Sequence, residues 1–393
     1  MTAYIYLVFA LVGFLQNGLG AMLPELMSSM DLDHGQAGML PAALLAAFGL
    51  VSVPFGKVLE RWGARPLLLL AWLAILCGAG LIMLRPTYQV ALAAMFLIGT
   101  GMSGLQVALI PALNHGCTAQ LFAARLTMVQ GIFGAASFVG PLLYAGLLRF
   151  GGSWRWIYMI GGALAVPGAA AAMTLRFPGP GPENRSASTG STNSAPLSIT
   201  AGAGQPVLGL LYFIGMAMYV GVEQGTATWI SAFGQEYHGF DPASTGAAMV
   251  SGFWLAFTAG NLMAALLLRR LPGHTLVLLL SGSGIAVLLA ALYGPPSLSF
   301  LSFALSGALY APLWALVYAM AFDELPNDHS LLSGLLTTAV AGGSVVAMGI
   351  GLVSDFLGLR AALTMLVSSL LFILFMGWRR IPQRPPVRPA AIP

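Results

Sequence analysis

Charged residues are scarce in this chain, because Asp, Glu, Lys and Arg together make up only 7% of its 393 residues. A soluble domain is charged at about a quarter of its positions, so this composition excludes a soluble fold. There are only two cysteines, which excludes a disulfide framework or a cysteine-rich metal site. Metal-ligand spacings and a phosphate-binding Gly-rich loop are missing as well, and this argues against an enzyme.

The chain is instead rich in apolar residues. Hydrophobic residues make up 58% of the chain and the mean hydropathy is +0.86, so the bilayer is the solvent that this sequence predicts. Many runs are long enough to cross about 30 Å of hydrocarbon as helices. We predict an all-α membrane protein with twelve transmembrane helices, at residues 3–26, 35–58, 66–84, 89–113, 122–148, 154–176, 207–232, 243–267, 274–294, 297–322, 331–354 and 360–378.

One polar segment divides the apolar runs into two sets of six. Residues 177–206 are rich in Pro, Gly, Ser, Thr and Asn, and such a segment buries too little apolar surface to order itself. We therefore predict a flexible linker on the cytoplasmic side. It joins an N-terminal six-helix bundle at 1–176 to a C-terminal bundle at 207–380, and a cytoplasmic tail follows at 381–393.

The placement of Lys and Arg predicts the orientation. With twelve spans and a cytoplasmic N-terminus, twelve of the sixteen basic residues fall in inner loops and the tail. Such an excess is the positive-inside pattern. We expect a multi-pass protein of the inner membrane with both termini in the cytoplasm.

An internal repeat supports the same plan. A glycine stands nine residues before an arginine in the loops after the second, fifth and eleventh spans, and a weaker copy follows the eighth. These pairs are Gly56 and Arg65, Gly146 and Arg155, Gly351 and Arg360, and in the weaker copy Ala265 and His274. Four copies of a three-helix unit are typical of transporters, whose substrate site lies near the middle of the membrane.

The loop from Gly56 to Arg65 resembles the signature loop of the major facilitator superfamily. Within that superfamily, residues 124–130, 219–223 and 310–316 are similar to motifs of the fucose permease type of sugar:proton symporters. The resemblance implies the major facilitator fold and a sugar-like substrate. In that type two carboxylates carry protons, and the corresponding positions in this chain are Gly20 and Gln106, which have no carboxylate. The resemblance therefore does not imply proton coupling at those positions.

Glu223 is the one ionisable side chain that we expect at the middle of the membrane. An ionised carboxylate there costs at least about 2.5 kcal/mol and rarely faces lipid. We hypothesise that Glu223 takes up and releases a proton during transport. The alternative is a structural glutamate that stays protonated or hydrogen-bonded beside Gln224.

Amide and aromatic side chains within the spans are candidate substrate contacts. Amides can orient hydroxyl groups and aromatic faces can stack on a ring, as a neutral sugar-like solute requires. Each of them could instead join helices to one another, as polar side chains often do in membranes. The candidates are Gln16, Asn17, Gln106, Gln130, Tyr219, Gln224, Asn261, Tyr310 and Trp314.

Charges at the cytoplasmic ends are candidate gating residues. Glu60, Arg61 and Arg65 could form an ion network that closes the inner path in one state, or they could serve only as positive-inside anchors. Arg125 could contribute to the gate or simply extend its charge to the interface.

The sequence therefore predicts a secondary transporter that moves a small neutral polar solute with protons by alternating access. The alternative is a proton-driven efflux antiporter for drugs or lipophilic cations, because the fifth span partly resembles the Gly-rich motif of such proteins. We predict no catalytic residues, cofactor, metal site or nucleic-acid partner. The expected partners are the solute, protons and the bilayer, and we expect a monomer.

Overall fold

The computed structural model describes all residues except 85–86, 115–118, 178–204, 269, 326–335, 337 and 381–393. The described residues form helices joined by short turns, and they contain no strand. An all-helical membrane fold is what the long apolar runs predict, because a helix satisfies its own backbone hydrogen bonds in lipid.

In the first half of the chain, the described residues form seven helices. They are α1 (Thr2–Asn17), α2 (Leu19–Met30), α3 (His34–Trp62), α4 (Ala64–Leu84), α5 (Tyr88–Asn114), α6 (Ala119–Arg149) and α7 (Arg155–Thr174). Helices α1 and α2 meet at Gly18 with a bend of 42° and together occupy the first predicted span. Each of the other five matches one predicted span to within a few residues.

The second half begins with α9. Its elements are α9 (Gln205–His238), the π-helical turn η1 (Pro242–Gly246), α10 (Ala247–Leu267), α11 (Gly273–Tyr293), α12 (Pro296–Tyr310), α13 (Leu313–Glu324), α15 (Gly342–Leu357), α16 (Leu359–Thr364) and α17 (Leu366–Arg379). Helices α12 and α13 together form one apolar span, and so do α16 and α17. The predicted span at 331–354 corresponds in part to α15, while residues 331–335 and 337 lie outside the described residues.

Ten helices of the described chain are long and apolar enough to cross a membrane, or eleven if the bent pair α1 and α2 counts as one span. Helix α15 is apolar but shorter. The prediction of twelve spans is thus not confirmed as a count. The linker at 178–204 and the tail at 381–393 lie outside the described residues, and the bundle boundaries stay predictions.

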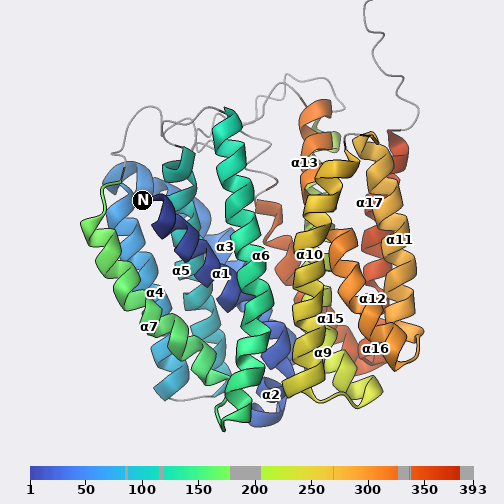
Figure 1. Cartoon of the computed structure of the whole chain (residues 1–393), viewed down its shortest axis with the longest axis horizontal. Coiled ribbons are helices and arrows are strands. Elements are labelled where there is room, and N and C mark those ends of the chain that lie inside the picture. Colours follow the sequence, from blue (N-terminus) through green and yellow to red (C-terminus); the bar gives the residue numbers. More distant parts are fainter. Residues whose placement is uncertain are drawn as a thin grey trace, which may run out of the picture.

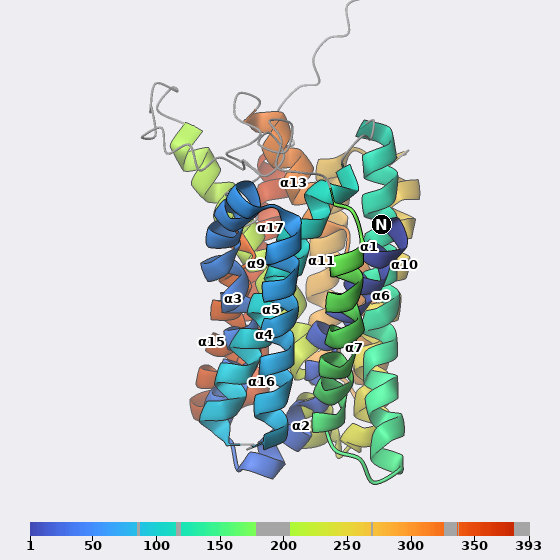
Figure 2. The ribbon, with the colours of Figure 1, turned by 90° about the vertical axis from the view of Figure 1, so that its left-hand side faces the viewer.

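Helices α1 to α7 lie on one side of the molecule and α9 to α17 on the other (Figure 1). Helices α3, α4, α5 and α7 run side by side in Figure 2. The two sides meet where α2 packs on α9, α3 on α15 and α6 on α10. Their meeting surface is called the seam below.

Glycines allow the helices at the seam to approach closely. A Cβ atom added to Gly20 of α2 would collide with the backbone oxygen of Ala227 on α9. On α3, a Cβ atom at Gly38 would lie 3.1 Å from the oxygen of Ala347 on α15. Small residues at helix contacts are typical of membrane proteins, where packing replaces the hydrophobic effect between helices.

We call the end of the molecule near His34 and His238 the outer end and the end near Trp62 and Glu324 the inner end, after the predicted orientation. Asp33 begins α3 at the outer end with a capping box, in which its side chain accepts from the backbone of Gln36. This cap stabilises the first turn of α3, because it satisfies backbone donors that have no partner within the helix.

Candidate functional site

Glu223 lies near the middle of α9, in a stretch that protein surrounds on every side. From Tyr219 to Gly234 every residue is buried except Glu223, which is half-buried. Helices α2, α10, α12, α15 and α17 pack against α9. The exposed part of Glu223 therefore opens to a space inside the protein rather than to lipid.

Two neutral donors hold the Glu223 carboxyl group. The Tyr219 hydroxyl donates to Oε2, and the Gln224 side-chain amide donates to Oε1 over 2.9 Å. Among the described residues, Glu223 forms no ion pair. The sequence placed Tyr219 four residues away on the same helical face, and the contact between the two side chains follows that spacing.

This arrangement suits a group that gains and loses a proton. Hydrogen bonds from neutral donors stabilise the carboxylate, whereas burial without a cation favours the neutral acid. Because Tyr219 and Gln224 both donate hydrogen bonds to Glu223, their first role in this structure is to hold its carboxyl group. Their contact with a substrate stays a prediction.

One face of α6 changes from buried to exposed towards the inner end. Tyr144, Ser137 and Gln130 share this face, since residues seven apart lie nearly above one another on a helix. Tyr144 and Ser137 are buried, whereas Gln130 is exposed. The lipid-facing side of α6 is a different one, where Val139 and Leu142 are exposed. Gln130 is therefore exposed on a different side of α6 from Val139 and Leu142.

Helix α10 shows the same change on the facing side of the seam. Ala247 and Trp254 are fully buried, and Asn261, seven residues further, is exposed on the same face. The two helices touch between these levels, because a Cβ atom at Gly134 of α6 would collide with the Thr258 hydroxyl of α10. Gln130 and Asn261 both lie about one helical turn on the inner side of that contact, so α6 and α10 present them at a similar depth.

Asn17 is buried beside the bend between α1 and α2. Its amide nitrogen donates to the Ser137 hydroxyl over 2.8 Å, and that hydroxyl donates to the oxygen of Phe133 over 2.8 Å. The Asn17 side-chain oxygen has no partner among the described residues. In this structure Asn17 thus joins α1 to α6, while one polar atom remains available.

The other predicted contacts lie on α1, α5, α12 and α13. Gln16 on α1 and Gln106 on α5 are half-buried. Tyr310 at the end of α12 is fully buried. Trp314 of α13 is half-buried and lies with its ring centre 4.5 Å from that of Tyr318.

The outer half of the seam is closed by contacts between the two sides. The Ser251 hydroxyl of α10 donates to the oxygen of Phe138 on α6 over 3.0 Å. Further out, the His34 side chain of α3 lies 3.1 Å from Glu236 of α9. These contacts join the two sides of the molecule at the outer end, whereas Gln130 and Asn261 are exposed further in.

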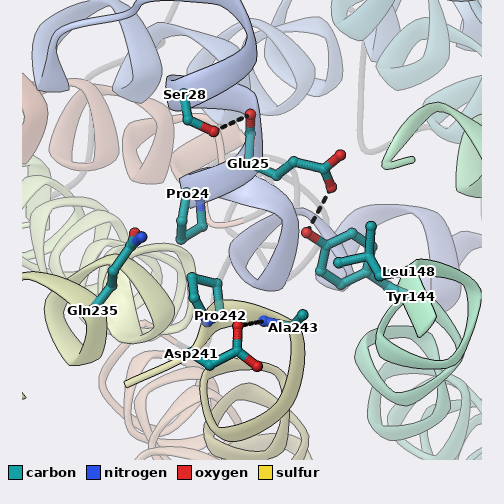
Figure 3. Close-up of a pocket in the computed structure, with 9 residues that line it drawn as sticks. All are labelled: Pro24, Glu25, Ser28, Tyr144, Leu148, Gln235, Asp241, Pro242 and Ala243. Carbon is teal, nitrogen blue, oxygen red and sulfur yellow. Dashed lines mark hydrogen bonds between the residues drawn. The ribbon is translucent and has the colours of Figure 1, made fainter. Parts of the chain in front are cut away.

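A surface pocket of about 310 Å³ lies at the outer end, between α2, α6, α9 and η1 (Figure 3). Glu25 and Tyr144 point towards each other on one side of it, and the Tyr144 hydroxyl donates to the Glu25 carboxylate over 2.8 Å. On the other side, the Asp241 carboxylate accepts from the backbone of Ala243 and the hydroxyl of Ser244. Both acids are satisfied locally, and the pocket is separate from Glu223.

The candidate gating residues lie at the inner end without forming the expected network. Arg65 donates to the oxygen of Leu175 over 3.1 Å, and Arg125 donates to that of Leu113 over 3.4 Å. Within the described part of the chain, Glu60 forms no ion pair with Arg61 or Arg65. A gate built from these charges remains a prediction for the state in which the inner end closes.

No group of three His, Cys, Asp or Glu side chains in the described residues could hold a metal ion. Sequence reasoning missed the outer contacts among His34, Glu236 and Asp355. These residues are 119 to 321 positions apart in the chain, and no local pattern signals such contacts.

Comparisons with known proteins place this geometry in context. The sequence profile described as Major Facilitator Superfamily matches residues 5–299. A protein named glucose/galactose transporter from Brucella abortus is 22% identical over 385 residues, which cover 94% of this chain and 92% of that protein. An MFS-type transporter, ppz2, from Metarhizium majus is 27% identical over 143 residues, covering 35% and 24% of the two chains.

Solved structures resemble this fold over almost their full length. The E. coli fucose:proton symporter FucP aligns with a TM-score of 0.63 at 17% identity, covering 96% of this chain and 98% of its own. The nucleoside transporter NupG aligns with a TM-score of 0.74 at 16% identity, covering 96% and 100%. At such identities the likeness concerns the fold.

Proposed function

The chain belongs to the Major Facilitator Superfamily, whose members are transporters and not enzymes, and from that premise we propose that it moves a small neutral polar solute, sugar-like in chemistry, together with protons. The observation that carries the proposal is the position of Glu223, an acid in the middle of α9 that opens to an internal space and is held by neutral donors.

A neutral solute is favoured by the polar groups that face the open inner seam. Gln130 and Asn261 are amides, which can donate to and accept from hydroxyl groups. A phosphate or organic anion would need a fixed cation in their place. The relative named glucose/galactose transporter, which aligns over 94% of this chain, supports a sugar among neutral solutes.

Glu223 is proposed to replace the two acids of the fucose permease pattern. At Gly20, where the pattern places the first acid, the backbone of Ala227 lies too close for any side chain. At the second position Gln106 is half-buried and cannot ionise. A proton can therefore be carried at mid-membrane depth by Glu223, with Tyr219 and Gln224 stabilising its charged form.

Alternating access is supported by the asymmetry of the seam. The outer half is closed by glycine contacts such as that of Gly38 with α15, and the inner half leaves Gln130 and Asn261 exposed. This corresponds to an inward-open state. In the opposite state the two sides would tilt to close the inner end, where Glu60, Arg61 and Arg65 are available for ion pairs.

We further propose the finer topology. Helix α15 is taken as the described part of an eleventh span, which with the bent first span gives twelve spans in two bundles of six. The twelve basic residues expected inside favour an inner-membrane protein with both termini in the cytoplasm. A single chain contains both halves of the seam, so a monomer suffices.

Uptake into liposomes tests the proposal. Purified protein should accumulate a radiolabelled sugar from a panel of neutral monosaccharides when the outside is acidic, and the sugar should protect Glu223 from a carbodiimide. Protection by a cationic dye with dye movement opposite to the protons would instead establish the antiporter alternative. Solute binding without accumulation would contradict active transport.

A further inference from the structure

The outer end of the seam contains a group of charges that joins the two sides of the molecule. His34, the first residue of α3, places Nε2 at 3.1 Å from Oε2 of Glu236 on α9. Its Nδ1 lies 3.6 Å from Oδ1 of Asp355 on α15. The imidazole ring also lies 5.8 Å, centre to centre, from the ring of Trp229. One side chain from the first half of the chain thus bridges two acids from the second half.

Asp355 also caps α3 across the seam. The backbone nitrogens of His34 and Gly35 donate to its two carboxylate oxygens, each over 2.9 Å. The first amides of a helix lack partners and carry partial positive charge, so a carboxylate is stabilised there. A Cβ atom at position 35 would lie 2.6 Å from Oδ2 of Asp355, and glycine alone leaves room for this cap.

We propose that His34, Glu236 and Asp355 form an outer lock that holds the seam closed when His34 is protonated and releases it when His34 is neutral. The proposal rests on the alternating access proposed above and adds a control by external pH that is independent of Glu223. The three residues are called the outer lock below.

The charges around His34 determine the sign of this control. Asp33 precedes it, and Glu236 and Asp355 face it from α9 and α15. The guanidinium group of Arg360 in α16 forms a cation–π contact with Tyr237 instead, at 4.3 Å from the centre of its ring. With a protonated imidazole the three acids surround one cation, whereas with a neutral imidazole three negative charges crowd together across the seam.

External protons can reach the outer lock. The side chains of His34, Glu236 and Asp355 keep 25%, 39% and 26% of their surface exposed. Histidine changes its charge between roughly pH 5 and 8. Acid outside the cell therefore closes the outer end and favours the inward-open state, and alkaline medium loosens it.

Distance measurements between spin labels test the outer lock. The labels are placed at Ser29→Cys on α2 and Ser297→Cys on α12, both exposed near the outer end, in a chain whose native cysteines are replaced by serine. Glu223→Gln is included to remove the inner proton site. From about pH 5.5 to about pH 8 we expect the ratio of short to long distances to fall about fivefold, the factor for two half-exposed ion pairs.

Variants of His34 give the expected contrasts. His34→Gln should lose the pH response and remain in the loosened distribution, and His34→Lys should lose it and remain closed. His238→Gln is the matched control at the outer end of α9 and should respond like the parent chain. A full pH response in His34→Gln, or a closed distribution that His34→Gln leaves unchanged, would overturn the outer lock while proton-coupled uptake could still stand. A single distance in every variant, at every pH, would overturn the outer lock and alternating access together.

Discussion

Replacing Glu223 with glutamine removes the proposed proton site while keeping its shape. The glutamine oxygen can accept from the Gln224 amide, as Oε1 does now over 2.9 Å, and its nitrogen can donate to the Tyr219 oxygen. Every polar group keeps a partner, so we expect the free energy of unfolding to change by less than about 1 kcal/mol. The variant should fold, insert and bind solute.

The transport defect should be large by comparison. A gradient of one pH unit supplies about 1.4 kcal/mol per proton, which corresponds to about tenfold accumulation of a neutral solute if one proton moves per cycle. With Glu223→Gln the solute should only equilibrate. The measurement is uptake into proteoliposomes across an imposed pH gradient, with counterflow without a gradient as the test of intact binding.

A matched control is available at Asp31. This residue is exposed at the outer turn with a φ of 52°, a conformation that asparagine tolerates. Asp31→Asn removes one negative charge without touching the seam and should accumulate solute as the parent does. If Glu223→Gln still accumulated about tenfold, the proton would travel elsewhere and the reasoning about α9 would be refuted.

Four further substitutions, one of them with a matched control, probe the seam and its contents. Tyr219→Phe removes a donor to a buried carboxyl group and should lower the free energy of unfolding by about 1–2 kcal/mol, measured by thermal denaturation. Gly38→Val should force the outer seam apart at an overpacking cost of about 1–3 kcal/mol and so make cysteines at the outer end more accessible. The control Gly80→Val should not, because no atom lies within 4 Å of a Cβ added there. Equal effects of the two variants would contradict the packing argument. Gln130→Leu and Asn261→Leu should each weaken sugar binding about tenfold, because each loses one hydrogen bond, and neither should lower the melting temperature. If calorimetry finds the affinity of one variant unchanged, the residue replaced in it does not belong to the site.

The helices could be predicted from the sequence because length and hydropathy alone determine what crosses a bilayer. The end of α9 was harder to predict. The prediction stopped at residue 232, but the helix continues to His238, since polar residues such as Glu236 reach the outer end and contact the other side of the seam. The break at Gly18 was not predicted either, because a bend depends on what packs against both halves of the span.

The candidate site, too, could be predicted only in part. Glu223 could be found because a charge in a long apolar run is unusual, and Tyr219 because helical spacing places it alongside. The exposure of Gln130 and Asn261 could not be predicted, since it depends on how the helices of the two sides pack against each other. The cap of Asp355 on α3 joins residues 320 positions apart and follows from tertiary packing alone.

Labelling from each side of the membrane tests alternating access most directly. A membrane-impermeant thiol reagent is applied to Gln130→Cys, in a chain without other cysteines, in oriented vesicles. In the proposed inward-open state, this cysteine should react rapidly from the inner side and scarcely from the outer side. Closure of the inner end on adding sugar, at a concentration that offsets the weaker binding expected of this variant, should slow the inner reaction. Rapid labelling from the outer side, or an inner rate that no solute or pH gradient changes, would contradict the account.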